Sequence, residues 1–322
     1  TSSCPCVSFE EIFVIRALFH ATTLPNASAP YNVLHLKIYY PAAPTNSDAE
    51  RMSGVIPADK TSAPMPVVIF FNGINVGIES YHWLAVKLAE ANIITVMYTH
   101  VAETLPGVIG LTPAIDLSKV KPDTYGSGAT CPAIQPILDS LAQLNSDEKS
   151  PLCGAMDLNH IILGGHSAGG TVALQNAQFF AQVKAVFAYA GHTMASTMLG
   201  FEAGTVLSVG NKSVMLMRGD KDGVIAASRV RYGTSEQSQD PVEKTFDEAC
   251  QPSAGEEALD VLLQGANHFA IAHPLDETTG RFFLDMEMTR PAEEIRNQIA
   301  GLVLAFIKKL ELRAEKTVIR KK

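Results

Sequence analysis

The sequence predicts an α/β fold in which a mostly parallel, doubly wound sheet is flanked by helices in a single domain. The continuous apolar run at residues 66–71 has the composition of a strand buried on both faces of a parallel sheet. An amphipathic segment at 79–92 follows it, then a second apolar run at 93–98, and this order indicates a right-handed parallel crossover. A third apolar run from Ile161 leads into a glycine-flanked turn that joins it directly to a helix-compatible segment.

The same patterns predict the remaining elements in order along the chain. Strands are predicted at 12–18, 32–40, 66–71, 93–98, from 161 to the glycine-flanked turn, and at 184–190, 213–218 and 259–264. Helices are predicted at 79–92, 133–144, 168–180, near 225–232 and from about 291. Pro41 is expected to end the second strand, and residues 41–65, 99–131 and 234–256 are expected to be irregular or polar connections.

Length and composition favour one large globular unit. The chain has 322 residues with 47% hydrophobic content, and neither an internal repeat nor a linker divides it. We therefore expect one domain over residues 1–322, with an N-terminal strand region at 1–20 and a C-terminal helix and tail at 291–322.

Charge and hydropathy argue against two classes of partner. The formal net charge is −8, and the basic cluster at 320–322 resembles a solvated tail, so nucleic acid is not expected to bind. The apolar run at 299–307 is too short to span a bilayer, and no integral membrane segment is expected. The oligomeric state is left open.

The cysteines form neither a disulfide framework nor a zinc signature, because they are five in number and irregularly spaced. They are Cys4, Cys6, Cys131, Cys153 and Cys250, and one or two bridges stay open. The chain begins at Thr1 rather than at methionine, so we expect a trimmed N-terminus. A cytoplasmic location is favoured over the export that a removed targeting segment would indicate.

The turn itself has the sequence Gly165-His166-Ser167-Ala168-Gly169. A strand, a Gly-x-Ser-x-Gly turn and a helix together form a nucleophile elbow, which lifts the serine hydroxyl above the sheet edge in a strained backbone conformation. Glycine is needed at 165 and 169 because a Cβ there would meet the neighbouring strand or helix. Ser167 is therefore the predicted nucleophile; the alternative is a tight turn with a passive serine.

A serine nucleophile needs a base and an orienting acid, which follow it in the order Ser, acid, His. Asp222 follows the strand predicted at 213–218 and is the predicted acid, because the residues between let its carboxylate curl back over the strand end. Asp220, two residues earlier, is its rival. For either residue the alternative is an ordinary turn aspartate beside glycine.

His268 is the predicted base, because it directly follows the last predicted strand, from where a loop can reach Ser167. His273 is the second candidate. His166 is expected to be a structural residue beneath the elbow. The other histidines show no metal-ligand spacing, so neither a metal nor another cofactor is expected.

Two backbone N–H groups should form an oxyanion hole. One is that of Ala168, the residue after the nucleophile. The other is expected from the loop after the strand at 66–71, at Ile74, where Gly73 lets the loop approach the serine closely.

These motifs resemble those of the α/β-hydrolases, and within them the chlorophyllase, dienelactone hydrolase and platelet-activating-factor acetylhydrolase group. The similarity runs from about residue 66 to about 273. Residues 70–75 and 81–85 resemble the oxyanion segment of chlorophyllases and cutinase-like polyester hydrolases, and 165–170 resembles the chlorophyllase motif Gly-His-Ser-Arg-Gly-Gly. Two residues depart from the pattern: Ala168 stands where chlorophyllases have arginine, and Asn72 where many relatives have histidine.

The residues and the resemblance together imply a serine carboxylic-ester hydrolase that acts on a small hydrophobic ester, either chlorophyllase-like or a general carboxylesterase. Ala168 argues against chlorophyll itself but not against ester chemistry. A polyester hydrolase, a thioesterase or an acyltransferase would use the same triad. A non-catalytic ligand-binding protein with this fold is the alternative from a different class.

Overall fold

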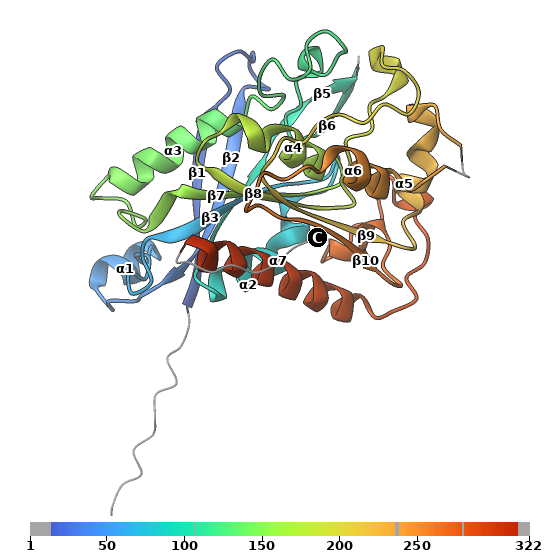
Figure 1. Ribbon diagram of the computed structural model, residues 1–322. Helices are drawn as coiled ribbons and strands as arrows, with labels where there is room; N and C mark the ends of the chain where they lie inside the picture. Colours follow the sequence, from blue (N-terminus) through green and yellow to red (C-terminus); the bar gives the residue numbers. More distant parts are fainter. Residues whose placement is uncertain (1–13, 106, 236–237, 279, 315–322) are drawn as a thin grey trace, which may run out of the picture.

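The computed structural model describes residues 14–105, 107–235, 238–278 and 280–314. Within them one eight-stranded sheet runs through the molecule in the order β1-β2-β4-β3-β7-β8-β9-β10 (Figure 1). Its strands are β1 (Val14–Thr23), β2 (Val33–Ala42), β3 (Met65–Phe71), β4 (Ile94–Thr99), β7 (Met156–His166), β8 (Val183–Tyr189), β9 (Ser213–Gly219) and β10 (Ala258–Leu263). A separate two-stranded hairpin is formed by β5 (Val101–Leu105) and β6 (Val108–Leu111).

Helices connect the strands. The α-helices are α1 (Asp48–Ser53), α2 (His82–Glu90), α3 (Ile134–Ser146), α4 (Ala168–Asn176), α5 (Gly223–Ser228), α6 (Pro241–Ala249) and α7 (Ala292–Ala314). The 3₁₀ turns are η1 (Ile78–Tyr81), η2 (Leu117–Lys119), η3 (Ala177–Phe179), η4 (Thr197–Leu199), η5 (Arg229–Tyr232), η6 (His268–Ile271) and η7 (Phe282–Leu284). None of the described helices is both long enough and apolar enough to cross a membrane.

The sheet is parallel except at one edge. From β4 to β10 every neighbouring pair is parallel, whereas β2 runs antiparallel to both β1 and β4. The carboxyl ends of β3, β7, β8, β9 and β10 therefore lie along the same edge, where residues from distant parts of the sequence can meet.

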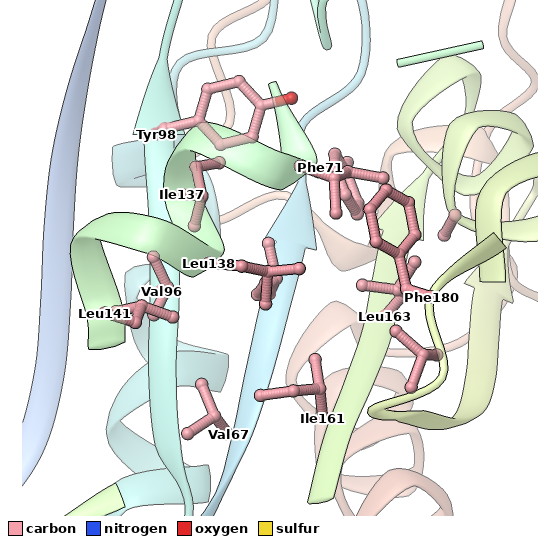
Figure 2. Close-up of a cluster of buried hydrophobic side chains, with 14 of the residues drawn as sticks. Val67, Phe71, Val96, Tyr98, Ile137, Leu138, Leu141, Ile161, Leu163 and Phe180 are labelled. Carbon is pink, nitrogen blue, oxygen red and sulfur yellow. The ribbon is translucent and has the colours of Figure 1, made fainter. Parts of the chain in front are cut away.

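Helices cover both faces, so the central strands are buried on both sides. Successive side chains of a strand point to opposite faces, and β3 accordingly sends Val67, Ile69 and Phe71 into one apolar cluster and Val68 and Phe70 into the other. On the first face α3 packs over β3 and β7, with its leucine and isoleucine side chains beside the strand residues (Figure 2). Helices α2 and α7 cover the second face. These two layers on one sheet are the predicted mostly parallel fold.

Three predicted connections contain regular structure, which corrects the sequence-based expectation. The segment 41–65 contains α1, whose N-cap Ser47 accepts a hydrogen bond from the Glu50 N–H at 3.3 Å. The segment 99–131 contains the β5–β6 hairpin, and 234–256 contains α6.

The prediction that Pro41 ends the second strand is also wrong, since β2 continues to Ala42. Pro41 pairs with Ile15 of β1, whereas β2 pairs with β4 only from His35 to Tyr39. At Pro41 the side of β2 away from β1 is no longer paired with β4; there the Pro41 carbonyl accepts from Asp59 N at 2.9 Å, and Ala42 forms a single bridge with Ala58. A proline is tolerated at this position because no β4 residue needs its N–H.

Some expectations fall outside the described residues. These are the first two residues of the strand predicted at 12–18, Cys4, Cys6 and the basic tail at 320–322. The single domain over 1–322 consequently stays a prediction. In the described part Cys131, Cys153 and Cys250 are free thiols.

Candidate active site

Strand β7 ends at His166 and α4 begins at Ala168, so Ser167 occupies a turn of a single residue. Its backbone has φ 54° and ψ −124°, a conformation that costs a residue with a Cβ free energy. The glycines on either side permit the turn: a Cβ on Gly165 would lie 2.4 Å from the Gly169 carbonyl carbon, and one on Gly169 would lie 2.2 Å from Phe71 O. The side chain of Ser167 is only half-buried and is accessible at the sheet edge.

Asp222 and His268 meet at the same edge, from the turns after β9 and β10. His268 Nδ1 and Asp222 Oδ2 are 2.9 Å apart, and both side chains are almost fully buried. Asp222 is also the N-cap of α5, because its Oδ1 accepts a hydrogen bond from Ile225 N at 2.8 Å. The carboxylate is therefore fixed at one oxygen by the helix and offers the other to the imidazole.

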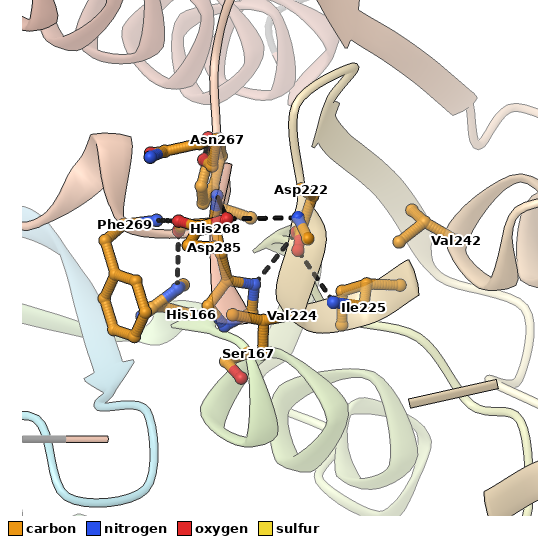
Figure 3. A network of polar contacts seen from close by, with 12 residues as sticks. His166, Ser167, Asp222, Val224, Ile225, Val242, Asn267, His268, Phe269 and Asp285 are labelled. Carbon is orange, nitrogen blue, oxygen red and sulfur yellow. Dashed lines mark hydrogen bonds and ion pairs between the residues drawn. The ribbon is translucent and has the colours of Figure 1, made fainter. Parts of the chain in front are cut away.

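Ser167 lies beneath the imidazole of His268 in the view of Figure 3, on the side away from Asp222. A second relationship keeps the two segments adjacent: the rings of His166 and His268 have centroids 4.7 Å apart. No hydrogen bond joins Ser167 Oγ to His268 in the described residues. Catalytic hydrogen bonds are often loose without substrate and tighten when it binds.

The rival candidates have other contacts. Asp220 accepts a hydrogen bond from Gly265 N and forms an ion pair with Lys221 at 3.5 Å, so it ties the two turns together away from the imidazole. His273 is exposed, and its N–H donates to Ser80 O at 2.7 Å. In this structure it is Asp222 and not Asp220 that contacts His268.

His166 is fully buried beneath the elbow, in a hydrogen-bonded chain that fixes its tautomer. Burial, reinforced by the nearby His268, lowers the pKa of His166 well below its usual value, so the ring is neutral. Its Nε2 is 3.0 Å from the His268 carbonyl oxygen, which can only accept; Nε2 therefore carries the proton. Nδ1 then accepts from the Tyr81 hydroxyl at 2.8 Å, and Tyr81 Oη accepts from Gly73 N at 3.1 Å.

That chain ends in the loop after β3, where the backbone N–H groups are almost all occupied. Gly73 N donates to Tyr81, Asn75 N to Leu111 O at 3.0 Å, and Val76 N to Gly73 O at 3.2 Å. The Ile74 N–H has no acceptor in the described part of the chain. The Ala168 N–H, at the first position of α4, likewise has none there, because helix starts leave such groups unpaired.

The buried side chain of Asn72 holds the same loop from inside. Its Nδ2 donates to Gly73 O and to Val76 O, both at 3.0 Å. On the outside, Asn75 Oδ1 accepts from Leu111 N at 3.0 Å, which attaches the loop to the β5–β6 hairpin. The loop therefore has one defined shape, with the Ile74 N–H left over.

Another buried histidine lies beside the site. His192 Nδ1 accepts from Met194 N at 3.1 Å, and its Nε2 is 3.1 Å from the Tyr232 hydroxyl. Burial is the main reason that its pKa falls to about 4. Its backbone carbonyl accepts from Thr171 Oγ1 at 2.8 Å, one turn after Ser167 on α4.

Sequence reasoning gave no role to Tyr81 and noted Asn72 only as a departure from a family pattern. It also missed Asp285, whose carboxylate accepts hydrogen bonds from the backbone of His268 and Phe269 (Figure 3). No local motif surrounds these residues, because their partners lie far away in the sequence. Among the described residues no group of three or more His, Cys, Asp or Glu side chains could hold a metal ion.

Comparison with known proteins supports the fold but does not identify the activity, which is argued from the residues of the site. No protein-family profile matches the chain, and no curated protein matches it in sequence. Among solved structures, a ferulic acid esterase from Streptomyces cinnamoneus is similar with a TM-score of 0.54 and 14% sequence identity, over 95% of this chain and 92% of that one. The mostly parallel sheet, its covering helices and this similarity together show that the chain has the α/β-hydrolase fold.

Proposed function

We propose that the protein is a serine hydrolase of carboxylic esters that needs no cofactor. The observation that carries the proposal is the 2.9 Å bond between His268 and Asp222 beside the strained elbow at Ser167. A hydroxyl, an imidazole and a carboxylate in this order along the chain are the groups that acyl transfer through a covalent intermediate requires.

In the proposed reaction His268 accepts the proton of Ser167 as Oγ attacks the ester carbonyl carbon. Asp222 holds the ring in the tautomer with hydrogen on Nδ1, which leaves Nε2 free to act as the base, and it stabilises the imidazolium that forms. The imidazolium then protonates the leaving alcohol, and water, activated by the same ring, releases the acid from Ser167. The N–H groups of Ile74 and Ala168 are the proposed donors to the oxyanion, worth roughly 3 kcal/mol each.

A hydrophobic ester is the proposed substrate class, because large apolar side chains around this edge are exposed. Ile74, in the proposed oxyanion loop, is 42% exposed, and Val108 and Ile109 in the attached hairpin are 49% and 59% exposed. Phe283, two residues before Asp285, is 81% exposed. A polar substrate would gain nothing from covering these surfaces, whereas an apolar acyl or alcohol group would remove them from water.

Turnover of a p-nitrophenyl ester tests the proposal. The wild type should release p-nitrophenol, Ser167→Ala should not, and Ser146→Ala at the far end of α3 should behave as wild type. No release by the folded wild type with any ester of a panel would contradict it. The panel should include short and long acyl chains, chlorophyll, phospholipids and, because of the named structural neighbour, a ferulate ester.

A further inference from the structure

The carboxylate of Asp285 binds the two turns that carry the acid and the base. Asp285 lies directly after η7, in a connection that belongs to neither a sheet strand nor an α-helix. Its Oδ1 accepts from Gly223 N at 3.1 Å, the residue next to Asp222, and from His268 N at 3.2 Å. Its Oδ2 accepts from Phe269 N at 3.1 Å.

The backbone just before Asp285 packs tightly against Gly223. A Cβ on Gly223 would lie 2.2 Å from Leu284 O, so the segment before Asp285 packs directly on the backbone of the acid turn. The other links between the two turns lie further from the imidazole: Lys221 N donates to Ala266 O at 2.9 Å, and Gly265 N donates to Asp220. Among the described residues, it is the Asp285 carboxylate that joins Gly223, next to Asp222, to the backbone of His268.

A second carboxylate beside Asp222 is electrostatically unfavourable. Burial raises the pKa of Asp285, and the charge of Asp222 adds to that effect, while the N–H groups of His268 and Phe269 and the charge of His268 act against it. A neutral amide could not replace it, because both carboxylate oxygens accept backbone N–H groups and an amide has one acceptor oxygen. The carboxylate is therefore explained by its hold on Gly223, His268 and Phe269 together.

We propose that Asp285 is a positioning residue for His268: through the backbone of both turns it holds the imidazole in register with Asp222. This inference rests on the proposed ester hydrolysis for its kinetic consequences. Its structural consequence, the contact between His268 Nδ1 and Asp222, holds whether or not the protein hydrolyses esters.

Asp285→Asn is the test variant and Glu287→Gln the matched control. Asparagine at 285 keeps the size of the side chain and one acceptor oxygen but removes the negative charge. Glu287 is exposed in the same segment, and its change to glutamine removes an equal charge there. With a p-nitrophenyl ester, Asp285→Asn should lower kcat about tenfold with little change in KM, because about one charge-assisted hydrogen bond is lost away from the substrate.

The proton NMR signal of the His268 Nδ1–H, which faces Asp222, separates the two hypotheses because it can be recorded without an ester. It should have the same downfield position in the wild type and in Glu287→Gln, and it should be shifted or lost in Asp285→Asn. An unchanged signal in folded Asp285→Asn would overturn the positioning role, even if activity fell. A changed signal in Asp285→Asn, together with a wild type that hydrolyses no ester, would support the role and contradict the proposed function.

Discussion

Tyr81 donates its hydroxyl proton to Nδ1 of His166 over 2.8 Å, and the same oxygen accepts the N–H of Gly73. Through His166 Nε2 the chain continues to the backbone carbonyl of His268. One buried tyrosine therefore connects the loop after β3, the elbow and the turn of the proposed base. These three segments are separate in the sequence but must be held together for the proposed acyl transfer.

Tyr81→Phe should reduce both stability and turnover. It leaves the Gly73 N–H without an acceptor and Nδ1 of His166 without a donor, which costs about 1–3 kcal/mol of unfolding free energy. It also frees the loop that carries the Ile74 N–H, so kcat should fall more than KM rises. Urea unfolding and ester kinetics measure the two effects.

Tyr98→Phe is the control for that variant. Its hydroxyl is also buried and donates to a backbone carbonyl, Pro113 O, at 2.7 Å, away from the elbow. It should lose stability and keep kcat. Equal kcat in Tyr81→Phe and Tyr98→Phe would contradict the role of Tyr81 in holding the loop.

Asn72→Asp should impair turnover strongly. The variant replaces the amide nitrogen, which donates to Gly73 O and Val76 O, with an oxygen that repels both carbonyls. Because the loop then loses its shape, we expect kcat/KM to fall by as much as about 10²–10³-fold, the effect of losing one oxyanion donor.

Asn145→Asp provides a matched change. Asn145 also bonds the backbone through both ends of its amide, at Met156 N and Met156 O, but far from the elbow. Its variant should lose stability and keep turnover in the remaining folded protein. If Asn72→Asp keeps wild-type kcat/KM, the inner support of the loop has no part in catalysis.

The stability of the protein should fall below neutral pH because of His192. Its pKa is about 4 in the folded protein and about 6.5 when unfolded, so the folded state resists protonation. The stability that its neutral form contributes is fully present above pH 6.5 and is lost as the pH falls toward 4. His166, whose pKa is also lowered, acts in the same direction.

Between pH 7.5 and 4.5 the contribution of His192 alone is roughly 2–3 kcal/mol of unfolding free energy. Urea unfolding of His192→Gln should therefore show a smaller loss over this interval than the wild type, whereas His35→Gln, at an exposed position of β2, should match the wild type. The same loss in His192→Gln as in wild type would show that His192 does not titrate in this way.

Replacing each aspartate in turn by asparagine should show whether Asp222 or Asp220 is the acid of the proposed triad. Asp222→Asn should lower kcat by about 10⁴, as the loss of a triad aspartate does, because the amide favours the wrong tautomer of His268. Asp220→Asn should be mild, since Asp220 binds Gly265 N and Lys221 instead. If Asp220→Asn is the crippling change, the assignment of the acid is wrong.

The sheet could be predicted from the sequence because its central strands are buried on both faces. Runs such as Val67–Phe71 are then apolar without interruption, and their composition alone identifies them. Asp222 and His268 could be predicted to meet because parallel strands place their carboxyl ends at the same edge of the sheet. That inference needs only strand order and direction.

Amphipathic and long-range features were harder to predict. Helix α6 lies in a polar segment, although Asp240 at its N-cap and Pro241 at its first position were local signals of a helix start. The roles of Tyr81 and Asp285 depend on contacts across the fold, and nothing next to them in the chain indicates those contacts. Such residues become visible only when backbone partners are known.

The most direct test of the account is the mass of the intact protein after incubation with a fluorophosphonate, which reacts with serines activated by a neighbouring base. The wild type should gain one adduct, on Ser167, while Ser167→Ala gains none and His268→Ala gains it far more slowly. No gain in mass by the folded wild type, or an adduct that persists in Ser167→Ala, would contradict the proposal that Ser167, His268 and Asp222 act together.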